Sequence, residues 1–159
     1  MSKNNQHVPD LVFFEPRIPQ NTGNAIRLAA VTGAHLHLVE PLGFELSEPK
    51  LKRAGLDYHD LANLTIHKNF AALLTCKPNS RIFAFTTKAT KRYDEPQYHA
   101  EDLLLFGPEP TGLPDEILEH PRISDKIIIP MLPGRRSLNI TSSASIAIYE
   151  AWRQSDFNF

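Results

Sequence analysis

Residues that could carry chemistry gather in four segments, and each segment follows or ends a run of apolar residues. The segments are EPRIPQNTGNAIR (15–27), FAFTTKATKR (83–92), LLFGPEPTGLP (104–114) and IPMLPGRRSLN (129–139). Glycine, proline, asparagine and hydroxyl residues are frequent in them, but the sequence has neither G-x-G-x-x-G nor G-x-x-x-x-G-K-[ST]. This pattern favours a ligand gripped by several loops over one whose phosphates sit on a single glycine-rich turn.

Arg27 is the most distinctive charged residue of the first segment. We expect it in the first or second turn of a helix, where a cation opposes the helix dipole. Two interpretations stay open locally: a solvent-facing arginine, or an arginine aimed at an electron-rich group in a cleft. Asn21, Thr22 and Asn24 are expected to cap this helix or to add donors to the same site. Gly107 directly follows an apolar run, where a missing side chain would let a ligand approach the backbone.

Basic residues form three short clusters, although the whole protein is close to neutral. The formal net charge is −1 and the sequence pI is about 6.6, which excludes a globally basic nucleic-acid-binding protein. A local basic face remains compatible with this balance, and clusters that share a face would suit a phosphate backbone. The clusters are Lys50, Lys52 and Arg53; Lys88, Lys91 and Arg92; and Arg135 and Arg136.

Metal and disulfide chemistry find little support in the sequence. The single cysteine, Cys76, allows neither an intrachain disulfide nor a four-cysteine zinc site. His35 and His37 share a face of an expected strand, but no nearby Cys, Asp or third His completes a ligand set, so we predict no metal. The start lacks the pattern of a signal peptide, and no apolar run approaches the roughly 18 residues that span a membrane. We therefore expect a cytoplasmic protein without membrane contact.

The elements that must position these loops alternate in the order typical of α/β proteins. Apolar runs predict strands at 11–14, 35–40, 63–67, 81–87, 102–107 and 126–131. Helical patterns predict helices at 24–34, 48–60, 69–78, 114–120 and 139–152, the first of them ended by Gly33. We predict a single α/β domain at 10–155, preceded by a flexible extension at 1–9. About six mostly parallel strands would be covered by helices on both faces.

In such a sheet, ligands bind beyond the carboxyl ends of the strands, so we expect the four segments to meet at one edge. The last helix adds a second expectation. Ile140, Ala144, Ile148 and Trp152 follow each other at i, i+4 spacing on one face, whereas Tyr149 lies on another. A helix that is apolar on more than one face is either central or meets a partner chain.

Five stretches, taken together, resemble the SPOUT superfamily of RNA methyltransferases. They are EPRIPQNTGNAIRLAAVTGAHLHLVEPLGF, KLKRAGLDYH, FAFTTK, LLFGPEPTGLP and IPMLPGRRSLNITSSASIAIYEAWRQ, spread over 11–154. The similarity is closest to the small single-domain branch, the tRNA (cytidine/uridine-34) 2′-O-methyltransferases, which act on the wobble nucleotide of leucine tRNAs. The resemblance implies a C-terminal trefoil knot, a homodimer, and S-adenosylmethionine as methyl donor with S-adenosylhomocysteine as product.

The resemblance also implies roles for individual residues. Arg27 matches the catalytic arginine; because it is a poor base at neutral pH, we expect it to position and polarise the ribose 2′-hydroxyl. The expected cofactor contacts are Phe85, Thr86, Gly107, Glu109, Ile129, Met131, Ser137, Leu138 and Asn139. The expected RNA contacts are Lys50, Arg53, Lys88, Arg135, Arg136 and Tyr149.

Three positions depart from the family pattern and bear on substrate choice. Pro110-Thr111, Gly134-Arg135 and Ser143 stand where relatives carry Thr-Arg, Asp/Asn-Ser and Asn. Two alternatives to the wobble-nucleotide enzyme stay open. One is a 2′-O-methyltransferase for another tRNA or rRNA site, and the other is a catalytically silent RNA-binding protein.

Overall fold

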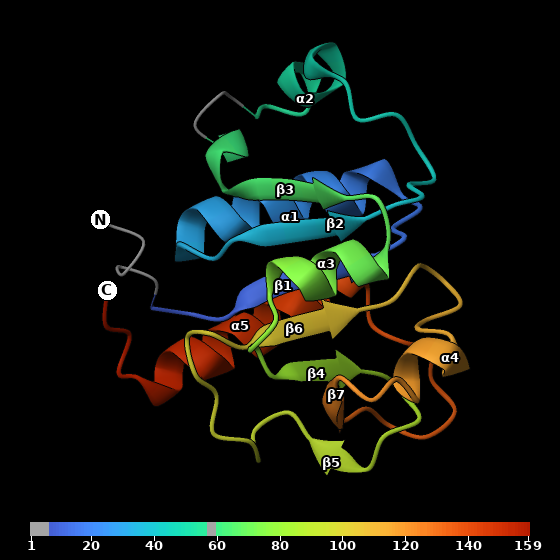
Figure 1. Ribbon diagram of the computed structural model, residues 1–159, viewed down its shortest axis with the longest axis vertical. Coiled ribbons are helices and arrows are strands. Elements are labelled where there is room, and N and C mark those ends of the chain that lie inside the picture. Colours follow the sequence, from blue (N-terminus) through green and yellow to red (C-terminus); the bar gives the residue numbers. More distant parts are fainter. Residues whose placement is uncertain (1–6, 57–59) are drawn as a thin grey trace.

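A parallel sheet organises the protein, whose computed structural model describes residues 7–56 and 60–159 (Figure 1). Within these residues the sheet has seven strands in the order β3-β2-β1-β6-β4-β7-β5, and every neighbouring pair is parallel. The strands are β1 Asp10–Phe14, β2 Leu36–Val39, β3 Leu64–His67, β4 Ile82–Phe85, β5 Lys91–Arg92, β6 Leu103–Phe106 and β7 Ile123–Ile128. The predicted α/β class is confirmed. The two-residue edge strand β5 was missed because it has no apolar pattern and exists only by pairing with β7.

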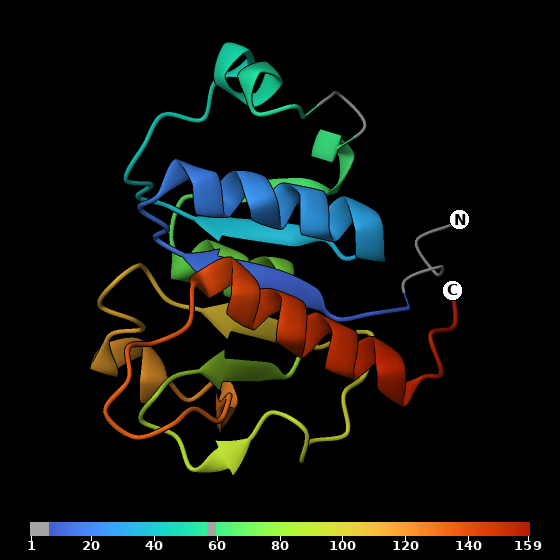
Figure 2. The same cartoon turned by 180° about the vertical axis from the view of Figure 1, so that it is seen from behind.

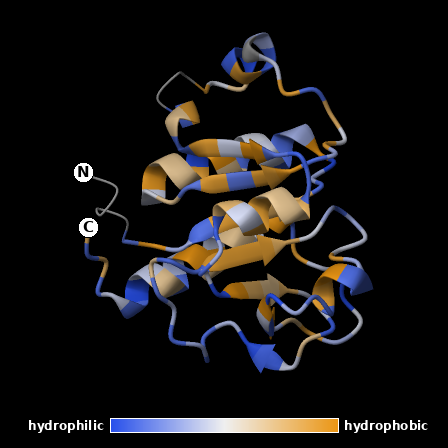
Figure 3. Cartoon of the chain, viewed as in Figure 1, coloured by the Kyte–Doolittle hydropathy of each residue, from blue (hydrophilic) through white to orange (hydrophobic). Residues whose placement is uncertain are grey.

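Helices cover both faces of the sheet, as predicted. Helices α1 (Pro19–Thr32) and α5 (Ile140–Gln154) lie side by side on one face (Figure 2). On the other face lie α3 (Phe70–Cys76) and α4 (Asp115–Leu118) (Figure 1). Alternate residues of the central strands feed two apolar cores: Phe13 and Leu104 pack on the α1–α5 side, and Val12 and Leu105 on the α3–α4 side. The hydropathy colouring shows these central strands as the apolar interior (Figure 3).

Helix α1 begins earlier than predicted, and this moves the polar residues at its start. Pro19 occupies the first turn, because a proline there loses no intrahelical hydrogen bond. Asn21 and Thr22 are therefore buried helical residues, and their predicted role as caps is wrong. Arg27 falls in the third turn, so the expected opposition to the helix dipole does not apply. Gly33 ends the helix with a left-handed φ of 81°, as predicted.

The predicted helix over 48–60 is shorter in the structure. Helix α2 spans Glu48–Arg53 and is capped by Ala54, and Gly55 has a left-handed φ of +81°. Residues 57–59 of the prediction lie outside the described residues, and a 3₁₀ turn follows at Asp60–Asn63.

The described segment before β1 and the segment after α5 lie at one side of the sheet, opposite the carboxyl ends of the strands (Figure 1). Residues 1–6 of the expected flexible extension lie outside the described residues. Within its last part, Val8 is fully buried, His7 Nε2 lies 2.8 Å from the carbonyl oxygen of Thr32, and the His7 ring packs 5.5 Å from that of Trp152.

Candidate cofactor pocket and its neighbouring groove

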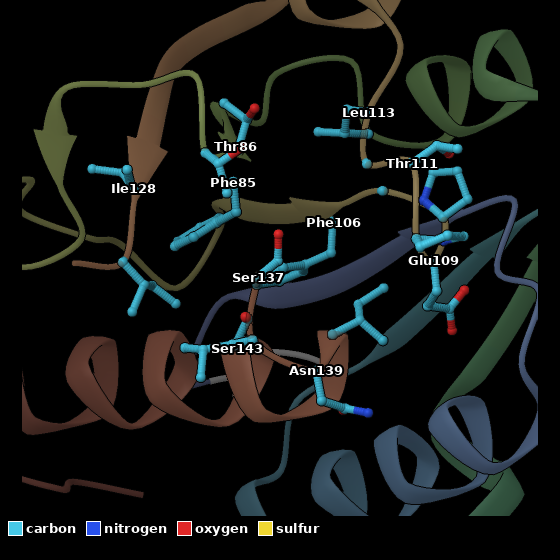
Figure 4. Close-up of a pocket in the computed structure, with 18 of the residues that line it drawn as sticks. Phe85, Thr86, Phe106, Glu109, Thr111, Leu113, Ile128, Ser137, Asn139 and Ser143 are labelled. Atoms are coloured by element: carbon cyan, nitrogen blue, oxygen red, sulfur yellow. The ribbon is translucent and has the colours of Figure 1, made fainter. Parts of the chain in front are cut away.

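A pocket of about 510 Å³ opens at the carboxyl ends of β4, β6 and β7, beside the start of α5 (Figure 4). This volume lies within the range of small-molecule sites in proteins. All residues expected to contact a cofactor line it: Phe85, Thr86, Gly107, Glu109, Ile129, Met131, Ser137, Leu138 and Asn139. They come from segments far apart in the sequence, because parallel strands bring their carboxyl ends to the same edge. The same lining includes Asn21, Arg136 and Ser143.

Aromatic rings and hydroxyl groups give the pocket its chemistry. The rings of Phe85 and Phe106 stack with centroids 4.7 Å apart and an interplanar angle of 22°. Thr86 and Leu113 lie on one side of the pocket, and Ser143 and Asn139 of the α5 start lie on the other (Figure 4). A flat apolar group with polar substituents would fit such a lining better than a polyphosphate.

The loop's own backbone gives a further reason for glycine at position 107. A Cβ at this position would lie 2.2 Å from the backbone nitrogen of Leu113 and 2.4 Å from the carbonyl carbon of Gly112. The loop folds back on itself, and the Gly112 N–H donates to the Pro108 carbonyl at 2.7 Å. The loop's backbone therefore fills the space that a side chain would need, while Gly107 itself lines the pocket.

Asn21 joins the loops that form the pocket. Glu109 accepts from the Arg17 N–H at 2.9 Å through Oε1 and from Asn21 Nδ2 at 2.8 Å through Oε2. On its other side, Asn21 Oδ1 accepts from Asn139 Nδ2 at 2.8 Å. A carboxylate only accepts hydrogen bonds, which fixes the orientation of the Asn21 amide. The Thr141 hydroxyl also donates to the backbone carbonyl of Asn21 at 2.7 Å, so a single residue of α1 holds both loops.

Asn139 also starts α5. Its Oδ1 accepts from the N–H groups of Thr141 and Ser142 at 2.8 and 3.3 Å, which satisfies donors that a helix start leaves free. The residue thus contributes to the pocket and sets the helix behind it. The sequence pointed to Asn139 and left open whether Asn21 caps its helix or adds a donor to the site; the structure favours the second alternative for Asn21.

Arg27 lies outside this pocket, on the exposed side of α1. It lines a shallow groove between α1 and the start of α5, together with Asn24, Leu28, Val31, Asn139, Thr141, Ser142 and Ser145. The groove shares Asn139 with the pocket, so the two cavities adjoin. The guanidinium donates from Nη2 to the carbonyl oxygen of Gly55 at 2.8 Å.

The residues expected to bind RNA are spread over several elements. Lys50 and Arg53 are exposed on α2, Arg135 is exposed in the loop before α5, and Tyr149 is 40% exposed on α5. The middle basic cluster is neutralised: Lys88, Lys91 and Arg92 pair with Asp115, Asp125 and Asp94 at 2.8, 2.7 and 3.0 Å. The pair with Lys88 holds the pKa of Asp115 below its ordinary value. Only the first and last clusters therefore remain free of such neutralisation in the described ion pairs.

A buried polar network joins β1, β2 and β3. His37 Nε2 lies 2.7 Å from Asp10 Oδ2, and His37 Nδ1 lies 2.8 Å from His67 Nε2. Lys77 Nζ lies 3.1 Å from the same Asp10 oxygen. Asp10 and His67 were not singled out in the sequence, since they reach His37 only through pairing of β1, β2 and β3.

The residues that the structure describes contain no group of three or more His, Cys, Asp or Glu side chains that could hold a metal ion. None of the helices in 7–56 and 60–159 has the length and apolar character needed to cross a membrane.

Comparison with known proteins bears on the family. Residues 10–149 match the model of the SpoU rRNA Methylase family. A tRNA (cytidine(34)-2′-O)-methyltransferase of Methylovorus glucosotrophus (strain SIP3-4) is 49% identical over 148 residues, which cover 93% of this chain and 96% of that protein. The protein of the same name from Escherichia coli (strain K12) is 47% identical over 145 residues, 91% and 92% of the two chains.

Solved structures of methyltransferases are also similar to this chain. One, from work on the 2-OH methylation of C/U34 on tRNA, is 46% identical, has a TM-score of 0.87 and covers 97% of this chain and 100% of that chain. The SpoU methyltransferase AviRb from Streptomyces viridochromogenes, in complex with the cofactor AdoMet, shares the fold with a TM-score of 0.81 at 21% identity, covering 97% and 63%. The resemblance seen in the motifs is confirmed, and the chain belongs to the SpoU rRNA Methylase family.

Proposed function

We propose that the protein methylates the ribose 2′-hydroxyl of nucleotide 34, a cytidine or modified uridine, in leucine tRNAs, with S-adenosylmethionine as methyl donor. The observation that carries this proposal is one pocket lined by every expected cofactor residue, in a chain nearly half identical to relatives named for that reaction. It also rests on the adjoining groove, which presents an arginine.

The pocket fits this donor by size and chemistry. The stacked Phe85 and Phe106 rings offer an apolar surface for an adenine, and we expect the backbone of Ile129, Met131 and Leu138, which line the same pocket, to meet its edges. The donor carries no phosphate, which agrees with the absence of the phosphate-binding glycine motifs from the sequence. When bound, it supplies an electrophilic methyl group on a sulfonium. The Asn21 bridge between Glu109 and Asn139 keeps both walls of the pocket in place.

Arg27 positions and polarises the acceptor, the ribose 2′-hydroxyl. A ribose hydroxyl is a weak nucleophile, so transfer depends on alignment and on stabilising the charge that develops on its oxygen. A guanidinium remains protonated and offers several N–H donors in one plane, which suits positioning and polarisation rather than proton removal. We place the acceptor ribose in the groove between α1 and α5, because Asn139 belongs to both the groove and the pocket.

The tRNA is expected to contact both α2 and the loop before α5. Lys50 and Arg53 on α2 and Arg135 and Arg136 in the loop are exposed, whereas Lys88 is neutralised by Asp115. We therefore expect the first four to contribute more to tRNA affinity than Lys88.

The active form is proposed to be a homodimer, with the knot expected of the family at its C-terminal end, acting in the cytoplasm. Exposed apolar residues on α1 and α5 support the dimer: Val31 on α1 and Tyr149 on α5 are 62% and 40% exposed. Light scattering of the purified protein tests this; a monomer at micromolar concentration would contradict it.

Methyl transfer from labelled S-adenosylmethionine to total tRNA, followed by mass-spectrometric mapping, tests the activity. We expect label on the 2′-oxygen of nucleotide 34. Label at another position would favour a different tRNA or rRNA site, and cofactor binding without transfer would favour a silent RNA-binding protein. The Arg27→Ala variant should fold, bind the donor and lose turnover. Arg153→Ala, which removes an exposed arginine paired with Glu150, is the matched control and should keep full activity.

A further inference from the structure

The hydrogen bond from Arg27 Nη2 to the Gly55 carbonyl joins the groove proposed for the acceptor ribose to the turn after α2, the helix proposed to contact tRNA. Arg27 stands on α1 beside the groove, whereas Gly55 closes the turn after α2, the helix that carries Lys50, Lys52 and Arg53. At 2.8 Å the bond has the ordinary length of a charge-assisted hydrogen bond, and both groups are exposed. An exposed hydrogen bond of this kind contributes little to the free energy of unfolding, so its main effect is on the orientation of the two groups it joins.

The turn that presents this carbonyl is anchored on both sides. Leu56 is only 4% exposed, and the half-buried Leu51 packs against the same apolar core. The backbone closes the turn with N–H donation from Gly55 to Lys52 at 3.0 Å and from Leu56 to Leu51 at 3.0 Å. The Gly55 carbonyl is therefore held in one direction, toward α1.

Glycine is the residue that allows this direction. Gly55 has a φ of +81°, a left-handed conformation that is sterically unfavourable for most other residues, whereas asparagine adopts it more readily. Space is not the constraint, because a Cβ there would meet Arg27 Nη2 at 3.4 Å, an ordinary contact. Substitution would thus act through the backbone, by turning the carbonyl away from the guanidinium.

We propose that Gly55 is a positioning residue for methyl transfer, and that its carbonyl aims the Arg27 guanidinium while leaving the remaining N–H donors free for the acceptor. This inference rests on the catalytic role proposed for Arg27. It also couples tRNA contact to catalysis, since any shift of α2 on binding RNA moves the carbonyl that holds the arginine. The α2 turn then acts on kcat, whereas its basic side chains act on tRNA affinity.

Substitution at Gly55 separates the two effects. Gly55→Ala should lower kcat about tenfold, because the turn abandons its left-handed conformation, with KM for tRNA and for the donor within about twofold of wild type. Gly55→Asn should restore most of kcat, since asparagine tolerates the conformation. Ala54→Val is the matched control: it adds bulk to the neighbouring residue, which is exposed and has an ordinary φ of −81°, and should leave all constants unchanged. Urea denaturation of each variant shows whether the fold is intact.

Several results would overturn the inference. An unchanged kcat in Gly55→Ala would do so, as would a raised kcat, which would mean that Gly55 holds the arginine away from the acceptor. A raised KM for tRNA with unchanged kcat would mean that the turn only contacts RNA and does not position Arg27. Equal losses in the alanine and asparagine variants would exclude the carbonyl direction as the cause. Arg27→Ala is measured in parallel: if it remains active, the role proposed for Arg27 fails, and if it alone is inactive, only the role of Gly55 fails.

Discussion

Replacing Asn21 by alanine tests whether one side chain holds the two walls of the pocket together. The change removes a hydrogen bond to the Glu109 carboxylate and one from the Asn139 amide, both 2.8 Å long. A bond to a charged group contributes about 1.5–3 kcal/mol and a neutral one about 0.5–1.5 kcal/mol. Because Glu109 is only half-buried and Asn139 is exposed, water can replace part of what is lost. We therefore expect the lower end, about 2 kcal/mol of unfolding free energy.

The assay for Asn21→Ala is urea denaturation at fixed protein concentration, joined to calorimetry with S-adenosylmethionine. Weaker donor binding should accompany the loss of stability, because both loops line the pocket. Gln20→Ala removes an exposed amide from the same turn of α1 and should change neither quantity. A loss below about 0.5 kcal/mol, the lower limit for a single neutral bond, together with unchanged donor affinity, would refute the bridging role. The double variant with Asn139→Ala should be non-additive, since the two side chains share a bond.

Three further predictions concern other parts of the protein. Burial lowers the pKa values of His35 and His67 below the ordinary 6.5, so the unfolded chain binds protons more readily and the free energy of unfolding should fall as pH drops below about 6.5. Although burial alone would raise the pKa of Asp10, its contacts with His37 and Lys77 hold it below 3.8, so a second loss should appear below that pH in a urea-denaturation series. The Thr22 hydroxyl is buried without a hydrogen-bond partner among the described residues, so Thr22→Val should raise the unfolding free energy by about 1 kcal/mol; a loss of stability would contradict this. Gly107→Ala should lower donor affinity at least about tenfold by calorimetry, and unfolding stability by about 1–3 kcal/mol, because the new Cβ must displace the Leu113 backbone; unchanged binding would show that the loop does not shape the pocket.

The main outline of the fold was predictable from local patterns. Short apolar runs with helical segments between them specify a parallel α/β sheet, since parallel strands require crossovers and both faces are then buried. Gly33 ended its helix as predicted, because glycine adopts the left-handed conformation of a helix C-terminus without a steric penalty. The start of α1 was misplaced, since Pro19 and Asn21 are as typical of loops as of first helical turns.

The sequence by itself also pointed to residues that line the pocket, because its motifs resemble those of a known family. Each expected contact, from Phe85 to Asn139, ends or follows a strand or precedes the last helix, and a parallel arrangement brings such positions to one edge. For these residues the motif match, the strand end and the pocket coincide.

Only the tertiary structure decided how those residues are held. Asn21 meets Glu109 and Asn139 across sequence separations of 88 and 118 residues, and Arg27 meets Gly55 across 28. The backbone of Leu113 fills the space that a side chain at position 107 would need. Hydrogen bonds and close contacts of this kind form only when the groups are positioned to within a few tenths of an ångström. The elements that carry these groups lie far apart in the sequence, so local patterns do not show how they are positioned. The sequence therefore shows which residues form the pocket, and packing between α1, α2 and the loops decides what each of them does there.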